Sequence, residues 1–125
     1  MYACDVAMVR EVLRQRRTTR IPGAPAYVRG LLNVRGTVLT VLDVGLRLQP
    51  DRASIDGGAI IIVHVGGRLV GLAVDEVLQV AAVQAAEPSD VSENDTSHLA
   101  RKLGQSDGRI VFHLDVPELV NQALV

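Results

Sequence analysis

The chain has 125 residues, of which 48% are hydrophobic and only 2% aromatic, so we predict a single domain, 1–125, with an aliphatic, strand-favouring core. Its net charge of −1 argues against a nucleic-acid-binding protein, which normally carries a strongly basic surface. Because no apolar run could cross a bilayer and no signal peptide is recognisable, we expect a cytoplasmic protein without membrane insertion. The single Cys4 cannot form an internal disulfide and fits a reducing compartment.

The first elements of the chain have an ambiguous pattern. Val6, Val9 and Leu13 recur at helical spacing and predict an amphipathic helix over residues 2–14. The β-branched Val9 and Val12 also allow an extended segment from Val9 to Leu13.

A basic cluster follows, with no aromatic residues between its arginines. This composition favours a solvated loop over a nucleic-acid site and leaves an acidic protein partner open. Its members are Arg14, Arg16, Arg17 and Arg20.

The next stretch predicts a β-hairpin. A proline before residues 26–28 is typical of the first turn of a short helix there. Two apolar runs, 31–34 and 37–44, are then separated by Arg35 and Gly36. A turn of this length needs a positive φ angle, which Gly36 supplies. Arg35 is therefore expected to project from a rigid turn.

The middle of the chain contains further apolar runs. After a connection over 45–58 with a helical turn at 46–48, strands are predicted over 59–65, 68–74 and 77–83. The first of these is apolar on both faces, which indicates a strand covered on both sides, as in a closed or double barrel rather than an open sheet. Gly66 and Gly67 form the turn between the first two strands.

The C-terminal third begins with a polar stretch, 87–102, that predicts a flexible loop. A turn at 105–108 precedes a final strand over 109–114. Asp115 is a suitable N-cap for a helix that runs to Leu124.

The residues that could carry out catalysis do not form a recognisable site. His64, His98 and His113 lack the spacing of a zinc site, and Asp43 and Asp75 each end a strand, where a carboxylate commonly caps the next element. We therefore expect no catalytic residue, metal or cofactor. An enzymatic or small-ligand-binding barrel that uses these side chains remains the alternative.

Four short motifs point to a known family. In this order, they resemble the signature of the CheW-like domain, an adaptor and kinase-regulatory module of bacterial chemotaxis, and the resemblance extends along nearly the whole chain. The motifs are Ile21-Pro-Gly-Ala-Pro25, Val28-Arg-Gly30, Asn33-Val-Arg-Gly36 and Val41-Leu-Asp43.

The resemblance implies a mostly-β fold of two small interlocked five-stranded SH3-like barrels with short helices. It also implies a short helical turn and a strand, in place of the helix, at the N-terminus. The family's first strand, which precedes the dipeptide matched by Tyr2 and Ala3, is missing, so the domain is expected to be N-terminally short. A strand-swapped homodimer could complete the open edge.

The implied function is that of a non-enzymatic adaptor, which couples the cytoplasmic tip of a chemoreceptor to the regulatory domain of the histidine kinase CheA. Carried over by position, Arg35 is the receptor-signalling arginine, Val9 and Glu11 lie beside the receptor groove, and Arg29 and Gly30 lie close to the same face. A CheW-like module of another chemosensory pathway, or of a larger kinase, is the nearer alternative.

Overall fold

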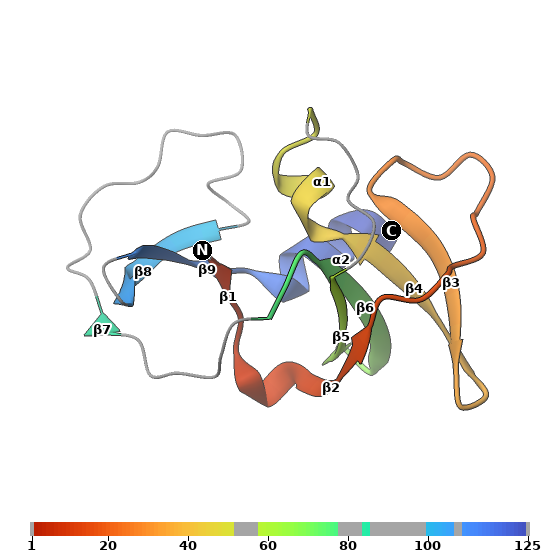
Figure 1. The fold of residues 1–125 in the computed structure, drawn as a ribbon, viewed down its shortest axis with the longest axis horizontal. Helices are drawn as coiled ribbons and strands as arrows, with labels where there is room; N and C mark the ends of the chain where they lie inside the picture. Colours follow the sequence, from red (N-terminus) through yellow and green to blue (C-terminus); the bar gives the residue numbers. More distant parts are fainter. Residues whose placement is uncertain (1, 52–57, 78–83, 86–99, 107–108, 125) are drawn as a thin grey trace. The chain divides into compact units, whose positions relative to one another are not determined.

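The structure is a computed structural model that describes residues 2–51, 58–77, 84–85, 100–106 and 109–124. It is mostly β, which confirms the predicted fold class. The chain divides into two compact units, one of residues 7–78 and one of residues 1–6 with 79–125 (Figure 1). The described strands form a five-stranded sheet in the first unit and a four-stranded sheet in the second, and the SH3-like barrel form stays a prediction.

The five-stranded sheet has the order β2-β5-β6-β4-β3, so β2 and β3 are its edges. All its pairs are antiparallel except β4 with β6. Its strands are β2 (Val9–Arg14), β3 (Val28–Val34), β4 (Thr37–Asp43), β5 (Ala59–Val65) and β6 (Arg68–Val74). The helix α1 (Val44–Leu48) follows β4 directly and confirms the predicted helical turn.

The helix predicted over residues 2–14 is wrong. A 3₁₀ turn, η1 (Val6–Met8), is followed by β2, as the family resemblance implied. Along β2 exposed and half-buried residues alternate. Because Val9 and Leu13 lie four residues apart, they satisfy a helical and a strand period equally, and pairing with β5 decides for the strand. The short helix predicted over 26–28 is also wrong, since Val28 already begins β3.

Both predicted hairpins of this unit are confirmed. In the β3–β4 hairpin Val34 pairs with Thr37 across a two-residue turn, and in the β5–β6 hairpin Val65 pairs with Arg68. The second turn consists of Gly66 and Gly67, with φ angles of +56° and +81°.

Alternating residues of the paired strands build an aliphatic core. They lie on β3, β4, β5 and β6, and each side chain points to the same interior because strand residues alternate between faces. The cluster consists of Leu32, Val34, Leu39, Val41, Ile60, Ile62 and Ala73, with Leu13 and Leu69 packed against it. Burial of aliphatic surface of this kind is the main stabilising contribution to such a unit.

The second unit contains a sheet of order β1-β9-β8-β7, in which β1 and β9 are parallel. Its strands are β1 (Tyr2–Ala3), β7 (Gln84–Ala85), β8 (Ala100–Ser106) and β9 (Arg109–Leu114). Residues 100–102, predicted as loop, and 105–106, predicted as turn, therefore belong to a strand. The predicted strand over 77–83 and most of the predicted loop fall outside the described residues.

Helix α2 (Val116–Leu124) ends this unit as predicted. Asp115 is its N-cap, because the Glu118 N–H donates to Asp115 Oδ1 at 3.1 Å. Among the helices within the described ranges, none has the length and apolarity needed to cross a membrane.

The segment that joins β2 to β3 is fixed against the β3 edge. Thr19 and Leu31 exchange two backbone hydrogen bonds of 2.8 Å. This close approach requires glycine at position 30, because a Cβ atom there would lie 2.1 Å from the Thr19 carbonyl oxygen. Gly30 also has a φ angle of +136°, which other residues rarely adopt. Gly30 therefore holds this connection in place.

We expect Gly30→Ala to destabilise the protein by about 3 kcal/mol, since it combines backbone strain with the loss of the Thr19–Leu31 hydrogen bonds. Chemical denaturation measures the loss. Gly23→Ala is the matched control: Gly23 also has a positive φ angle, +80°, but no atom lies within 4 Å of its added Cβ. It should lose only about 1 kcal/mol. Equal losses for the two variants would contradict the steric argument.

Candidate functional site

Arg35 lies in the β3–β4 turn with an unusual backbone conformation. Its φ angle is +50° and that of Gly36 is +86°, so two consecutive residues are left-handed. The turn is closed by the Gly36 N–H, which donates to Asn33 Oδ1 at 2.9 Å. This two-residue turn normally takes Asn, Asp or Gly at its first position, since other side chains are strained there. Arg35 thus occupies the turn against local backbone preference.

The Arg35 guanidinium forms a two-pronged ion pair with Glu11. Nη1 of Arg35 donates to Glu11 Oε2 at 2.8 Å, and Nη2 donates to Oε1. Glu11 belongs to β2 and Arg35 follows β3, so the pair joins the two edge strands of the sheet. The Arg35 side chain nevertheless remains 73% exposed, against 26% for Glu11. Part of the guanidinium is therefore available to a partner.

The ion pair stands at the rim of an open groove of about 620 Å³ within this unit. The floor of the groove is apolar and consists of Val34, Leu39, Ile62 and Leu69, which belong to the core cluster or pack against it. Its rim is polar and includes Arg10, Glu11, Arg35 and His64. We call this feature the Glu11–Arg35 groove. An apolar floor with a charged rim suits an amphipathic segment of another protein.

The two ionisable groups of the pair stabilise each other's charged form. The hydrogen bond from Arg35, followed by its charge and that of Arg16, lowers the pKa of Glu11 against a smaller opposing effect of desolvation. The hydrogen bond to Glu11 and the charge of that carboxylate raise the pKa of Arg35. The pair is therefore fully charged at neutral pH.

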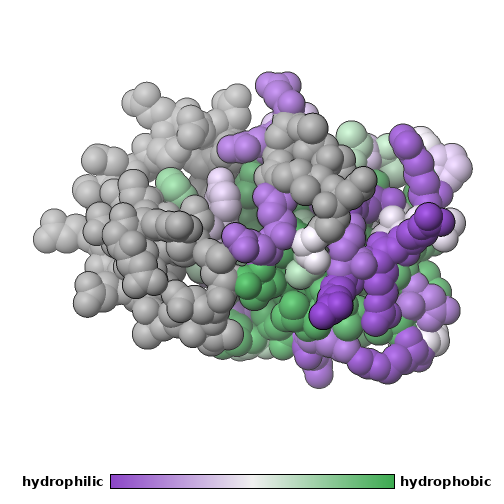
Figure 2. Space-filling model, in the orientation of Figure 1, coloured by the Kyte–Doolittle hydropathy of each residue, from purple (hydrophilic) through white to green (hydrophobic). Residues whose placement is uncertain are grey.

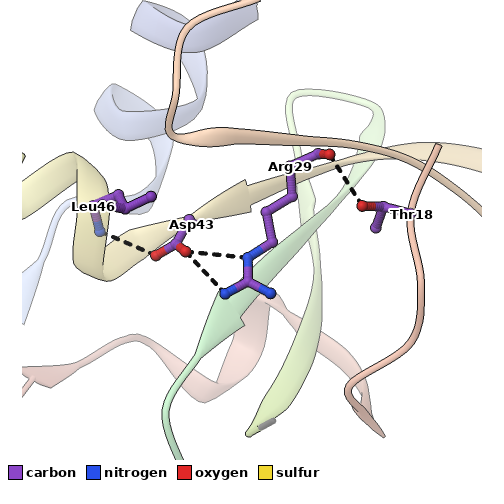
Figure 3. Close-up of polar contacts among 4 residues, drawn as sticks. All are labelled: Thr18, Arg29, Asp43 and Leu46. Atoms are coloured by element: carbon purple, nitrogen blue, oxygen red, sulfur yellow. Dashed lines mark hydrogen bonds and ion pairs between the residues drawn. The ribbon is translucent and has the colours of Figure 1, made fainter. Parts of the chain in front are cut away.

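A second ion pair lies at the other end of the β3–β4 hairpin (Figure 3). Arg29 Nε and Nη2 donate to Asp43 Oδ2 at 3.1 and 2.9 Å. The other carboxylate oxygen of Asp43 accepts the Leu46 N–H at 3.0 Å, which confirms Asp43 as the N-cap of α1. Thr18 Oγ1 donates to the Arg29 carbonyl oxygen at 3.0 Å. Asp43 is only 6% exposed, so this pair is structural.

The comparisons with known proteins agree with the sequence resemblance. The CheW-like domain model matches residues 1–124. The chain belongs to the CheW-like family. It is 29% identical to Chemotaxis protein CheW of Bacillus subtilis over 97% of the chain and 80% of that protein, and 34% identical to Protein PilI of Pseudomonas aeruginosa over 61% of the chain and 43% of that protein.

A solved structure gives the same result. The scaffolding protein TtCheW from Thermoanaerobacter tengcongensis matches with a TM-score of 0.79 and 26% sequence identity, over 92% of this chain and 77% of that one. The CheW-like family is one of scaffolds and adaptors. Together, the family model, the CheW relatives and this scaffold structure support a chemotaxis coupling adaptor role.

Of the five CheW-like receptor-face residues expected from the sequence, the structure brings Glu11 and Arg35 into direct contact. Val9 is half-buried on the same strand as Glu11 and pairs with Val63. Arg29 pairs with Asp43 and Gly30 lies against Thr19. Neither lines the groove, and their place on the receptor face stays a prediction. We therefore leave Arg29 and Gly30 out of the candidate groove.

Sequence reasoning missed the rim position of Arg10. The register of β2 with β5 shifts between Val9 and Glu11. Such an irregularity redirects a side chain in a way that no sequence period reveals. His64, interpreted as a structural strand residue, also lies on the groove. Within the described part of the chain no three His, Cys, Asp or Glu side chains gather as a metal site would require.

The Arg29–Asp43 pair generates a stability prediction. Asp43→Ala removes both the helix cap and the counter-charge of Arg29, so unfolding should become easier by about 2–4 kcal/mol. Asp43→Asn keeps a cap oxygen for the Leu46 N–H and a neutral acceptor for Arg29, and should lose only about 1–2 kcal/mol. Urea denaturation distinguishes the two variants. A larger loss for Asn than for Ala would contradict this assignment.

The Glu11–Arg35 pair generates a titration prediction. In Arg35→Gln the Glu11 pKa should rise towards its ordinary value, because the main cause of its lowering is removed. Since the folded pKa of Glu11 lies below its unfolded value, the pair stabilises the fold above the unfolded pKa and ceases to do so as pH falls through the folded pKa. NMR of the Glu11 carboxyl carbon measures the shift. An unchanged pKa in the variant would show that the pair does not persist in solution.

Proposed function

We propose that the Glu11–Arg35 groove is where this adaptor binds the cytoplasmic tip of a chemoreceptor, while other surfaces of the same CheW-like domain bind the regulatory domain of the histidine kinase CheA. The observation that carries the proposal is the position of Arg35. It is exposed, held in a left-handed turn and paired with Glu11 at the rim of the groove.

The backbone strain at Arg35 supports a functional role. An asparagine or glycine would occupy this turn with less strain, and a charged side chain at an exposed tip does little for the core. Because Glu11 holds the guanidinium in one orientation, a partner that binds it loses less conformational entropy. A preorganised arginine of this kind is what an adaptor needs to recognise a carboxylate or carbonyl group.

The groove supports a weak interaction. A helix laid on the floor would bury two or three aliphatic side chains, each contributing about 1.5–3 kcal/mol against the entropy of association. Such a sum corresponds to an affinity in the micromolar range, about −8 kcal/mol. Strong coupling of receptor and kinase would then require many adaptors acting together.

A second candidate keeps the adaptor and changes the pathway. The chain would then serve another chemosensory pathway or be a CheW-like region of a larger kinase. One of its relatives, Protein PilI, is not named as a chemotaxis protein. Asp43 is a poor candidate for the enzymatic alternative, because its carboxylate accepts hydrogen bonds from Arg29 and from the Leu46 N–H at the start of α1. The genes that neighbour this one distinguish the two pathways.

The groove proposal is tested by binding a purified receptor tip fragment and the CheA regulatory domain. Arg35→Ala should weaken binding of the receptor fragment about three- to tenfold, as expected for one partly exposed charged contact. Its affinity for the kinase domain should be unchanged. Arg109→Ala, which lies on β9 in the other unit, is the control and should bind the receptor fragment normally.

The swapped variant Glu11→Arg with Arg35→Glu separates binding from stability. It keeps an ion pair across the edge strands but reverses the charges presented to the partner. We expect near-normal stability and weak receptor binding. Receptor binding as strong as in the unchanged protein, in either this variant or Arg35→Ala, would remove Arg35 from the receptor surface.

A further inference from the structure

The 7–78 unit contains a stretch that is rich in arginine. Between Glu11 and Asp43 the sequence has no acidic residue, yet it has arginines at positions 14, 16, 17, 20, 29 and 35. Figure 2 shows strongly hydrophilic side chains, in purple, over the part of the molecule that carries β3 and β4. The positive charge of this stretch is therefore local, although the whole chain has a net charge of only −1.

Two of these arginines form ion pairs, and the charge of a third, Arg16, also acts on Glu11 without a direct contact. Glu11 pairs with Arg35 and Asp43 pairs with Arg29. The remaining four are all exposed, and within the described residues no hydrogen bond or ion pair joins any of them to a carboxylate. We call these four the arginine strip: Arg14, Arg16, Arg17 and Arg20.

The backbone beneath the arginine strip is held in place. The Gln15 N–H donates to the Gly58 carbonyl oxygen at 3.2 Å, and Thr18 Oγ1 donates to the Arg29 carbonyl oxygen at 3.0 Å. Thr19 is tied to Leu31 by two further hydrogen bonds. Hydrogen bonds therefore occur at three positions between the arginines. A partner would find these charges on an ordered segment, so binding would not have to order the backbone.

We propose that the arginine strip is a binding surface for an acidic, carboxylate-rich segment of a partner protein. A guanidinium donates two parallel hydrogen bonds to one carboxylate, which an ammonium group cannot do, and Lys102 is the only lysine of the chain. The strip uses residues other than those of the receptor groove. It therefore goes beyond the function proposed above and does not depend on it.

The observations favour an acidic protein over two other polyanions. Single-stranded nucleic acid is usually held by aromatic side chains between the basic ones, and the strip has none. Peripheral membrane binding typically uses an amphipathic helix with apolar residues opposite the charges. Here the charges lie on the end of β2 and on a non-helical connection.

Fluorescence anisotropy with labelled deca-glutamate tests the proposal on the intact chain. The variant Arg14→Gln, Arg16→Gln, Arg17→Gln, Arg20→Gln should bind the peptide about tenfold more weakly or worse, since it removes four exposed charged contacts. Binding to the unchanged protein should also weaken as salt is raised. The control replaces four cations elsewhere by glutamine, at Arg68, Arg101, Lys102 and Arg109, and should bind nearly as well as the unchanged protein.

Two further titrations distinguish an acidic protein from a nucleic acid and from a membrane. Single-stranded deca-thymidylate and vesicles that contain phosphatidylserine are titrated under the same conditions. Tighter binding of either than of deca-glutamate would overturn the proposal, as would equal losses in the strip variant and in the control. If the fourfold variant is misfolded by circular dichroism, Arg16→Gln with Arg17→Gln should give an intermediate loss. An unchanged affinity of that variant would also contradict the proposal.

Discussion

Ion pairs at both ends of the β3–β4 hairpin are the constraint on which this structure depends. At one end Arg29 binds Asp43, which is nearly buried and also caps α1. At the other end Arg35 binds Glu11 across the edges of the sheet. The first pair is shielded from water, so breaking it leaves a charge without compensation. The second is exposed, and a partner can compete for Arg35 at little cost. The hairpin is thus fixed at the end that carries Arg29 and Asp43. At its turn, a partner can replace Glu11 as the counter-charge of Arg35.

The arginines that stabilise the fold differ from those for which we propose a role in recognition. Arg29 contributes to the fold because its charge is neutralised inside it. Arg35 is oriented by Glu11 and remains mostly exposed. The arginine strip is exposed on a backbone that Thr19 and Gly30 hold against β3. The function of an adaptor rests on presenting side chains in fixed positions to other proteins.

Local rules predicted much of the framework. Asp43 and Asp115 were recognised as helix caps from their positions at strand ends, and both accept the expected N–H groups. The hairpin turn at Arg35 and Gly36 followed from two apolar runs separated by two residues. These features depend on contacts between residues close in sequence, and such contacts are encoded by residue type and spacing. The prediction of an N-terminal helix was wrong because the spacing of Val9 and Leu13 fits both a helix and a strand. Only the pairing of β2 with β5 distinguishes the two.

The sequence by itself determined the mostly-β fold, the hairpins, the caps and the family, since each rests on short-range patterns or on motifs that can be compared directly. Only the tertiary structure decided which charges meet. Glu11 and Arg35 are 24 residues apart, and their contact depends on how the sheet brings its two edge strands together. Likewise, the clash that makes Gly30 indispensable involves Thr19, whose carbonyl reaches position 30 only when the connection folds against β3. Distances between strands arise from the packing of the whole core, and no local pattern records them.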